Sequence, residues 1–117
     1  MEKVLKALAD GNRLRIMNLL MRGELCVCEL VEILGLSQTN VSRHLNKLTQ
    51  AGLLDFRKEA QWVFYRINND FMKEHSFLAK YLKASFENNK AFHMDIDKLL
   101  KTKRDLASGM LQQCKKA

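Results

Sequence analysis

The chain has 117 residues, of which 47% are apolar, and this size suits one domain with a modest core. Its 20 Lys and Arg residues against 13 Asp and Glu give a net charge of +7, which favours a polyanionic partner such as nucleic acid. No apolar run approaches the ~18 residues of a membrane span, and Met1 opens no signal-peptide pattern, so we expect a cytoplasmic protein without a membrane partner. The three cysteines are too few and too odd in number for a structural disulfide framework, which leaves thiols for metal or redox chemistry.

The first third of the chain is expected to form three short helices. Residues 1–9 make the first, and Asp10 is the expected N-cap of a second over residues 12–21, which Gly23 ends. Residues 24–34 contain two of the cysteines and make the third helix, directly before the next element.

The stretch from residue 34 to residue 54 has both ends of a helix marked. Ser37 is a ready N-cap, Gly52 stops the helix after Gln50, and apolar residues recur along one side. The other side has hydrogen-bond donors and acceptors but no acid, as in the second helix of a helix-turn-helix, which contacts base edges and phosphates. For His44 a packed position is the alternative to a phosphate contact. The candidate DNA-binding residues of this helix are Gln38, Thr39, Asn40, Ser42, Arg43, His44 and Lys47.

After Gly52 the apolar period changes from helical to alternating. Residues 53–58 and 61–67 are expected to form two antiparallel strands. A hairpin beside a recognition helix is the wing of a winged helix, which lies along the minor groove or nearby phosphates. A lone hairpin is marginal in water, so its aromatic residues are expected to pack partly on the helices. The candidate DNA contacts of the hairpin are Arg57, Lys58 and Gln61.

Residues 70–117 are expected to be helical and to form a dimerisation region next to a winged-helix core at residues 1–69. Asn69 or Asp70 can cap the first helix, and a break is expected around residues 87–90. The second helix carries an apolar seam with alternating spacings of four and three residues, as in coiled coils; it consists of Phe92, Ile96, Leu99, Lys103, Leu106 and Met110. We infer a homodimer interface built from the terminal helices, with helices that fold back on their own domain as the alternative. The expected fold class is mainly α with a β-hairpin (α+β), a single winged helix-turn-helix domain with dimerising terminal helices.

Three consecutive blocks carry a resemblance to a known family. They are LADGNRLRIMNLL at residues 8–20, GELCVCELVEILGLSQTNVSRHLNKLTQAGLL at residues 23–54 and RKEAQWVFYRIN at residues 57–68. Over about residues 1–69 the chain resembles the ArsR/SmtB family of dimeric winged-helix metal-sensing repressors, and specifically its arsenic and cadmium/lead sensors, whose signature is the ELCVCEL-type box. The resemblance implies a homodimeric repressor that binds a palindromic operator in double-stranded DNA and releases it when a thiophilic ion binds. Cys26 and Cys28 would be the metal thiolates, and the polar residues named above would contact DNA.

The sequence departs from the family pattern in several places. Val31 stands where arsenite sensors often have a third cysteine, the N-terminal arm that supplies cysteines in cadmium and lead sensors is almost missing, and the Asp-x-His of zinc sensors does not occur. The wing tip has Glu59 and Ala60 where the family usually has a glycine, so we expect a turn without a positive φ.

Cys26 and Cys28 suit one ion only where the helix around them is irregular. Side chains at i and i+2 on a regular helix point about 200° apart, so we expect the pair at a frayed helix start. There the positive end of the helix dipole favours the thiolate form that binds metal. Thiolates select soft ions, most suitably As(III) or Sb(III), with Cd(II), Pb(II) or Zn(II) as alternatives. Trigonal As(III) takes three sulfurs, so Cys114 is the candidate third ligand, and an incidental tail thiol is the alternative.

The expected function is transcriptional repression that responds to a metalloid, as in arsenical resistance. A repressor of the same fold that responds to Cd, Pb or Zn is an alternative, and so is a redox-responsive one in which Cys28 and Cys114 form a disulfide. An enzyme with a catalytic cofactor is not expected, because the sequence has no Cys-x-x-Cys beside a βαβ unit, no nucleophile with an obvious base and no phosphate loop. A metal buffer that never touches DNA conflicts with the basic helix face at Arg43 and Lys47.

Overall fold

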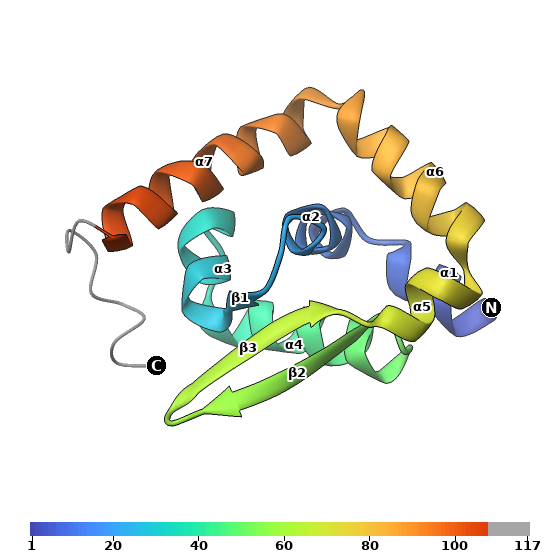
Figure 1. Ribbon diagram of the computed structural model, residues 1–117, viewed down its shortest axis with the longest axis horizontal. Helices are drawn as coiled ribbons and strands as arrows, with labels where there is room; N and C mark the ends of the chain where they lie inside the picture. The colour runs from blue at the N-terminus through green and yellow to red at the C-terminus, as the bar shows by residue number, and fades with distance from the viewer. Residues whose placement is uncertain (108–117) are drawn as a thin grey trace.

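Seven helices and three short strands make up the part of the chain that the structure, a computed structural model, describes: residues 1–107, with side chains placed through residue 104 (Figure 1). In chain order the elements are α1 (Glu2–Leu8), α2 (Gly11–Leu20), β1 (Leu25–Cys26), α3 (Val27–Leu34), α4 (Gln38–Gln50), β2 (Leu54–Glu59), β3 (Trp62–Ile67), α5 (Asn69–Glu74), α6 (Ser76–Glu87) and α7 (Lys90–Ala107). None of the described helices is long and apolar enough to cross a membrane.

Local capping signals set the helix boundaries. The Asp10 carboxylate accepts from the backbone N–H groups of Asn12 and Arg13 at 2.9 and 3.1 Å, which confirms it as the N-cap of α2. The Ser37 hydroxyl accepts from the Asn40 N–H at 3.2 Å and caps α4 as predicted. The cap of α5 is Asn68, one residue before the predicted position.

The predicted hairpin forms, and a third strand that the sequence did not indicate joins it. β2 and β3 pair antiparallel with Leu54 opposite Ile67, and β1 pairs with the other edge of β3, which gives the strand order β1-β3-β2. Residues 25 and 26, predicted to be helical, are therefore strand, and α3 starts only at Val27. Two residues are too short a run to show an alternating pattern, and backbone pairing with β3 decides their conformation.

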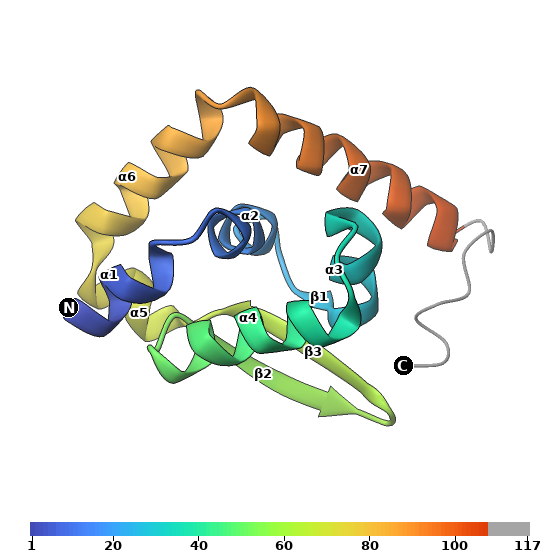
Figure 2. The same ribbon diagram turned by 180° about the vertical axis from the view of Figure 1, so that it is seen from behind.

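The core lies where α2, α3 and α4 meet the sheet. Its fully buried side chains are aliphatic and come from every one of these elements, as Ile16, Leu30, Val41, Leu45 and Leu53 illustrate. α2 runs through the centre, α4 and the hairpin cover one side of it, and α6 and α7 form an arch over the other side (Figures 1 and 2). This arrangement of a helix-turn-helix followed by a hairpin is a winged helix-turn-helix, which confirms the predicted fold class.

The C-terminal helices differ in part from the expectation. The predicted break occurs at Asn88, but a further break at His75 separates α5 from α6. α7 packs on α2 and α3 of its own chain, where Ile96 and Leu99 are buried and Phe92 contacts Phe86 with ring centroids 4.8 Å apart. For this half of the seam the inference of a dimer interface is wrong, and the alternative of folding back is confirmed. Of the other seam residues, Lys103 is exposed, and the side chains of Leu106 and Met110 lie outside the described residues.

Exposed apolar side chains gather instead on α1 and α6. Phe77 and Tyr81 of α6 are 86% and 69% exposed, and Leu5 of α1 is 52% exposed. Large apolar side chains with this exposure are typical of surfaces that another protein covers. These two terminal helices therefore replace the α7 seam as the candidate dimer face.

Candidate nucleic-acid interface and cysteine pair

The outer face of α4 is polar, basic and free of acids. Val41, Leu45 and Leu48 point into the core with no exposed surface, and this fixes which side of the helix faces out. The Arg43 guanidinium donates to the Asn40 side-chain oxygen, so these two predicted contacts lie together near the start of the helix. The structure leaves most of the predicted helix residues exposed, namely Gln38, Thr39, Ser42, Arg43 and Lys47, and Asn40 half-buried. Such a face can donate to and accept from base edges and phosphates.

His44 lies apart from this face. Its ring is half-buried, and Nδ1 is 3.3 Å from Nη1 of Arg13 on α2. Burial lowers the pKa of the imidazole, and the neighbouring guanidinium adds to the effect. The structure thus favours the packed role over the phosphate contact for this residue.

Arg57 fastens the hairpin to the rest of the domain. Its guanidinium donates to the Glu24 carboxylate at 2.7 and 3.0 Å and to the Glu59 carboxylate at 2.8 Å. It also lies 4.5 Å from the centre of the Phe64 ring. These carboxylates, Glu24 first, raise the pKa of Arg57 further. Because both neighbours are acids, a contact between Arg57 and DNA stays a prediction, and it would have to compete with these bonds.

The tip of the hairpin differs from the expected turn. Ala60 has a φ of 57°, in the left-handed region, although we expected no positive φ there. The loop between β2 and β3 has two residues, and the turns that fit such a loop require a positive φ at the first of them. The geometry of the strands therefore overrides the preference of the alanine. Lys58 and Gln61 are exposed at this tip, as a contact with phosphates requires.

The cysteine pair spans the junction between β1 and α3. Cys26 is the N-cap of α3 with an extended backbone, φ −84° and ψ 162°, and Cys28 is the second helical residue. The extended residue brings the two sulfur atoms to one side, 2.6 Å apart, which a regular helix would not allow. The prediction that the pair lies at an irregular helix start is confirmed.

Glu29 holds this junction in place and was not predicted as a site residue. Its carboxylate accepts from the Cys26 N–H at 3.0 Å and lies 3.6 Å from Nζ of Lys103 on α7. The Glu29 side chain is only 9% exposed. Its position three residues after the N-cap is that of a capping box, so the spacing in the sequence contained a signal for it.

Burial decides the protonation of Cys26. The residue is 2% exposed, and desolvation raises the pKa of its thiol to about 11, with the charge of Glu29 adding to the shift. The expectation that the helix dipole favours a thiolate is therefore wrong for Cys26, because burial outweighs the dipole. Ion binding at this sulfur has to displace a proton.

The described residues supply two soft donors and no complete metal site. Nowhere in residues 1–104 do three His, Cys, Asp or Glu side chains lie close enough to hold one ion. The chemistry of two adjacent sulfurs fits a thiophilic ion, and a third sulfur would complete a trigonal set. Cys114, the candidate third ligand, lies outside the described residues.

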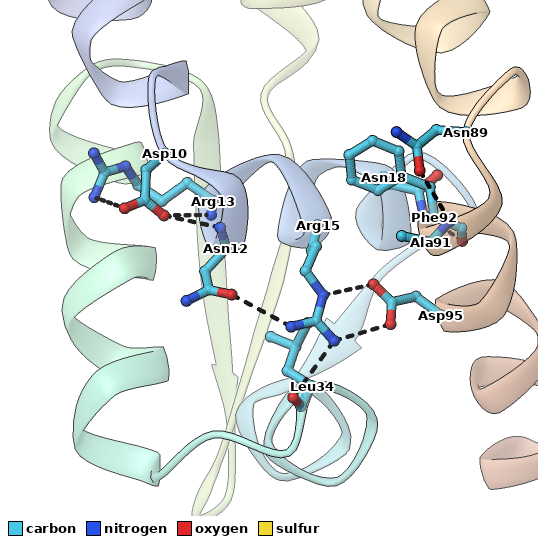
Figure 3. A network of polar contacts seen from close by, with 10 residues as sticks. All are labelled: Asp10, Asn12, Arg13, Arg15, Asn18, Leu34, Asn89, Ala91, Phe92 and Asp95. Atoms are coloured by element: carbon cyan, nitrogen blue, oxygen red, sulfur yellow. Dashed lines mark hydrogen bonds and ion pairs between the residues drawn. The ribbon is translucent and has the colours of Figure 1, made fainter.

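A second polar link joins α7 to the other end of α3 (Figure 3). The Arg15 guanidinium of α2 donates to the Asp95 carboxylate of α7 at 2.8 and 3.0 Å and to the backbone carbonyl of Leu34 at 3.5 Å. Leu34 is the last residue of α3, three positions before the N-cap of α4. Arg15 and Asp95 are 80 positions apart, and no local pattern in the sequence marks them as partners.

Comparison with known proteins agrees with this architecture. Residues 10–55 match the family described as "Bacterial regulatory protein, arsR family". The arsenic resistance transcriptional regulator ArsR1 of Pseudomonas putida is 53% identical over 66 residues, which are 56% of this chain and 52% of ArsR1, so the chain spans about half of that relative.

Two solved structures match more of the fold. HlyU from Vibrio cholerae N16961, which carries the name transcriptional activator, superposes with a TM-score of 0.60 at 41% identity over 70% of this chain and 89% of HlyU. The homodimeric winged helix-turn-helix DNA-binding domain Mb0332 from Mycobacterium bovis superposes with a TM-score of 0.62 at 31% identity over 76% of this chain and 83% of that domain. Sequence, fold and relatives agree, and the chain belongs to the arsR family of bacterial regulatory proteins.

Proposed function

We propose that this protein is a transcriptional repressor that binds a palindromic operator as a homodimer. The observation that carries the proposal is the outer face of α4, where Arg43 and Lys47 stand among amides and hydroxyls without an acid. A helix with such a face, held by a buried opposite side, fits the major groove. The names of ArsR1 and of the homodimeric Mb0332 domain support both DNA binding and dimerisation.

The other contacts follow from the place of each element. With α4 in the major groove, Lys58 and Gln61 at the hairpin tip would meet phosphates beyond one end of the helix. The exposed Phe77, Tyr81 and Leu5 would be covered by the second subunit. Two copies joined in this way present two recognition helices to the two halves of a palindrome.

Cys26 and Cys28 would bind the inducer, an As(III) or Sb(III) ion, and Cys114 would supply the third sulfur. The ion contributes strong bonds to soft sulfur ligands. The contribution of the protein is mechanical, since Cys26 is the N-cap of α3 and its N–H is held by Glu29. When both sulfurs turn to one ligand, this cap has to change, and α3 ends only three residues before the N-cap of α4. A coupling of about 1–3 kcal/mol between the two sites would weaken operator binding about 5- to 150-fold.

A redox-responsive repressor is the second candidate. The 2.6 Å separation of the two sulfurs places one thiol within reach of the other. Peroxide would take two electrons from two thiols, whose protons leave in two molecules of water as the disulfide forms. Either Cys28 with Cys114 or the adjacent pair itself could provide the two thiols.

Fluorescence anisotropy on a duplex from the region upstream of the protein's own gene tests both candidates. We expect tight, salt-dependent binding, much weaker binding to a scrambled duplex, and release by arsenite under reducing conditions. Titrations with Cd(II) and Zn(II) compare the alternative ions. Release by peroxide in the absence of metal, with no effect of arsenite, would replace the metalloid sensor by the redox sensor. Equal affinity for operator and scrambled duplex would contradict a specific repressor.

A further inference from the structure

A groove with several positive charges lies between α1 and the C-terminal half of α4. It has a volume of about 300 Å³ and is lined by Lys3 and Lys6 of α1, Arg13 of α2 and Lys47 of α4, among others. None of its described lining residues is acidic. In Figure 2 α1 lies beside the end of α4 that is farther from the hairpin tip, and Figure 1 shows the same order from the opposite side.

The fold holds these cations together although like charges repel. Nε of Arg13 donates to the carbonyl of Ala7 at 2.5 Å, and this bond fastens the last turn of α1 to α2. Val4 and Ala7 are buried, which leaves Lys3 and Lys6 on the outer side of the same short helix. Within residues 1–104 no ion pair engages Lys3, Lys6 or Lys47, whereas Arg13 is paired with Asp10. Three lysines around one groove therefore have charge available for an external anion.

We propose that this groove binds a phosphate of the operator backbone, so that α1 is a further DNA contact beside α4 and the hairpin. The inference rests on the proposed function and extends it to residues outside the helix-turn-helix and the wing. Lys47 belongs both to the exposed face of α4 and to the groove, so the two surfaces are continuous. A phosphate suits point charges of this kind, and several cations without an acid favour it over a neutral or cationic ligand.

The place of the groove predicts which phosphate it binds. α1 is one of the two helices with exposed apolar side chains, and it lies near the N-terminal end of α6 (Figure 1). In a dimer joined through α1 and α6, the groove faces the DNA between the two recognition helices. Its phosphate therefore belongs to the centre of the palindrome, whereas the hairpin tip meets the backbone at the outer ends.

The salt dependence of DNA binding tests this contact. The variant is Lys3→Ala combined with Lys6→Ala, measured by anisotropy on the upstream duplex and on a random-sequence duplex of equal length. Each lost phosphate contact lowers the slope of log K against log salt by ~0.9, so we expect the slope to fall by up to ~1.8 on both duplexes. The same relation gives about a fivefold loss of affinity per lysine near ~0.15 M salt. Lys3→Arg with Lys6→Arg keeps the charges and should keep the slope.

The matched control removes two exposed lysines on the other side of the molecule. Lys98→Ala with Lys101→Ala changes the net charge equally, but α7 lies across α2 from α4. We expect the wild-type slope for this control. A slope for the α1 variant equal to that of the control would overturn the groove proposal while Arg43→Ala still weakens operator binding. Failure of the wild-type protein to bind either duplex would overturn the proposed function as well.

Discussion

The ion pair between Arg15 and Asp95 should be a major source of stability, because it joins the C-terminal helix to the winged-helix core. Asp95→Asn keeps the volume of the side chain but removes its charge and one of two acceptors. Hydrogen bonds between charged groups contribute about 1.5–3 kcal/mol, and breaking a fully buried pair costs about 3–5 kcal/mol. The Asp95 side chain is 5% exposed, but Arg15 is 27% exposed and keeps a bond to Asn12 at 3.3 Å. We therefore expect a loss of about 2–3 kcal/mol in the free energy of unfolding.

Equilibrium unfolding in urea measures this loss as a lower midpoint at an unchanged slope. Asp97→Asn is the matched control, since it makes the same chemical change two residues further along α7 at an exposed position. We expect the control to stay within about 0.5 kcal/mol of the wild-type protein. Equal losses for the two variants, or a loss below about 0.5 kcal/mol for Asp95→Asn, would refute the reasoning.

Three further changes test other parts of the structure. Arg43→Ala should cost about 1–3 kcal/mol in operator affinity, measured by anisotropy, if the guanidinium reads a base. Ala60→Gly should raise the free energy of unfolding by up to about 1 kcal/mol because it relieves a positive φ, whereas Ala84→Gly in the exposed interior of α6 should lower it by about 1 kcal/mol. Cys114→Ser should weaken arsenite binding and change its stoichiometry, measured by titration of the reduced protein.

Each of these expectations has an outcome that contradicts it. An equal loss for Arg43→Ala on random DNA would make Arg43 a phosphate contact. Destabilisation by both glycine variants would mean that the hairpin turn carries no strain at Ala60. Arsenite binding with unchanged affinity and stoichiometry in Cys114→Ser would exclude Cys114 from the site.

Features that depend on neighbouring residues were predictable from the sequence. Asp10 and Ser37 cap their helices through bonds that span two or three residues, and the buried side of α4 repeats at helical spacing. The position of the cysteine pair also followed from local geometry, since side chains at i and i+2 can meet only where the helix is not regular.

Features that depend on contacts across the chain were not predictable. Leu25 and Cys26 are strand because Tyr65 and Phe64 lie opposite them, and Arg15 finds Asp95 only once α7 has folded over α2. The thiol of Cys26 is neutral because the tertiary fold buries it, which the helix dipole argument could not include. Packing of α7 on its own domain likewise depends on where α6 directs the chain.

The most direct test of the central claim follows one complex during an arsenite titration. Labelled operator duplex, saturated with reduced wild-type protein, is titrated with arsenite while its anisotropy is recorded, and the Cys26→Ser protein is treated in parallel. The account predicts that arsenite lowers the anisotropy to that of free DNA for the wild-type protein and leaves the Cys26→Ser complex intact. Release of both proteins at the same arsenite concentration, or of neither, would contradict it.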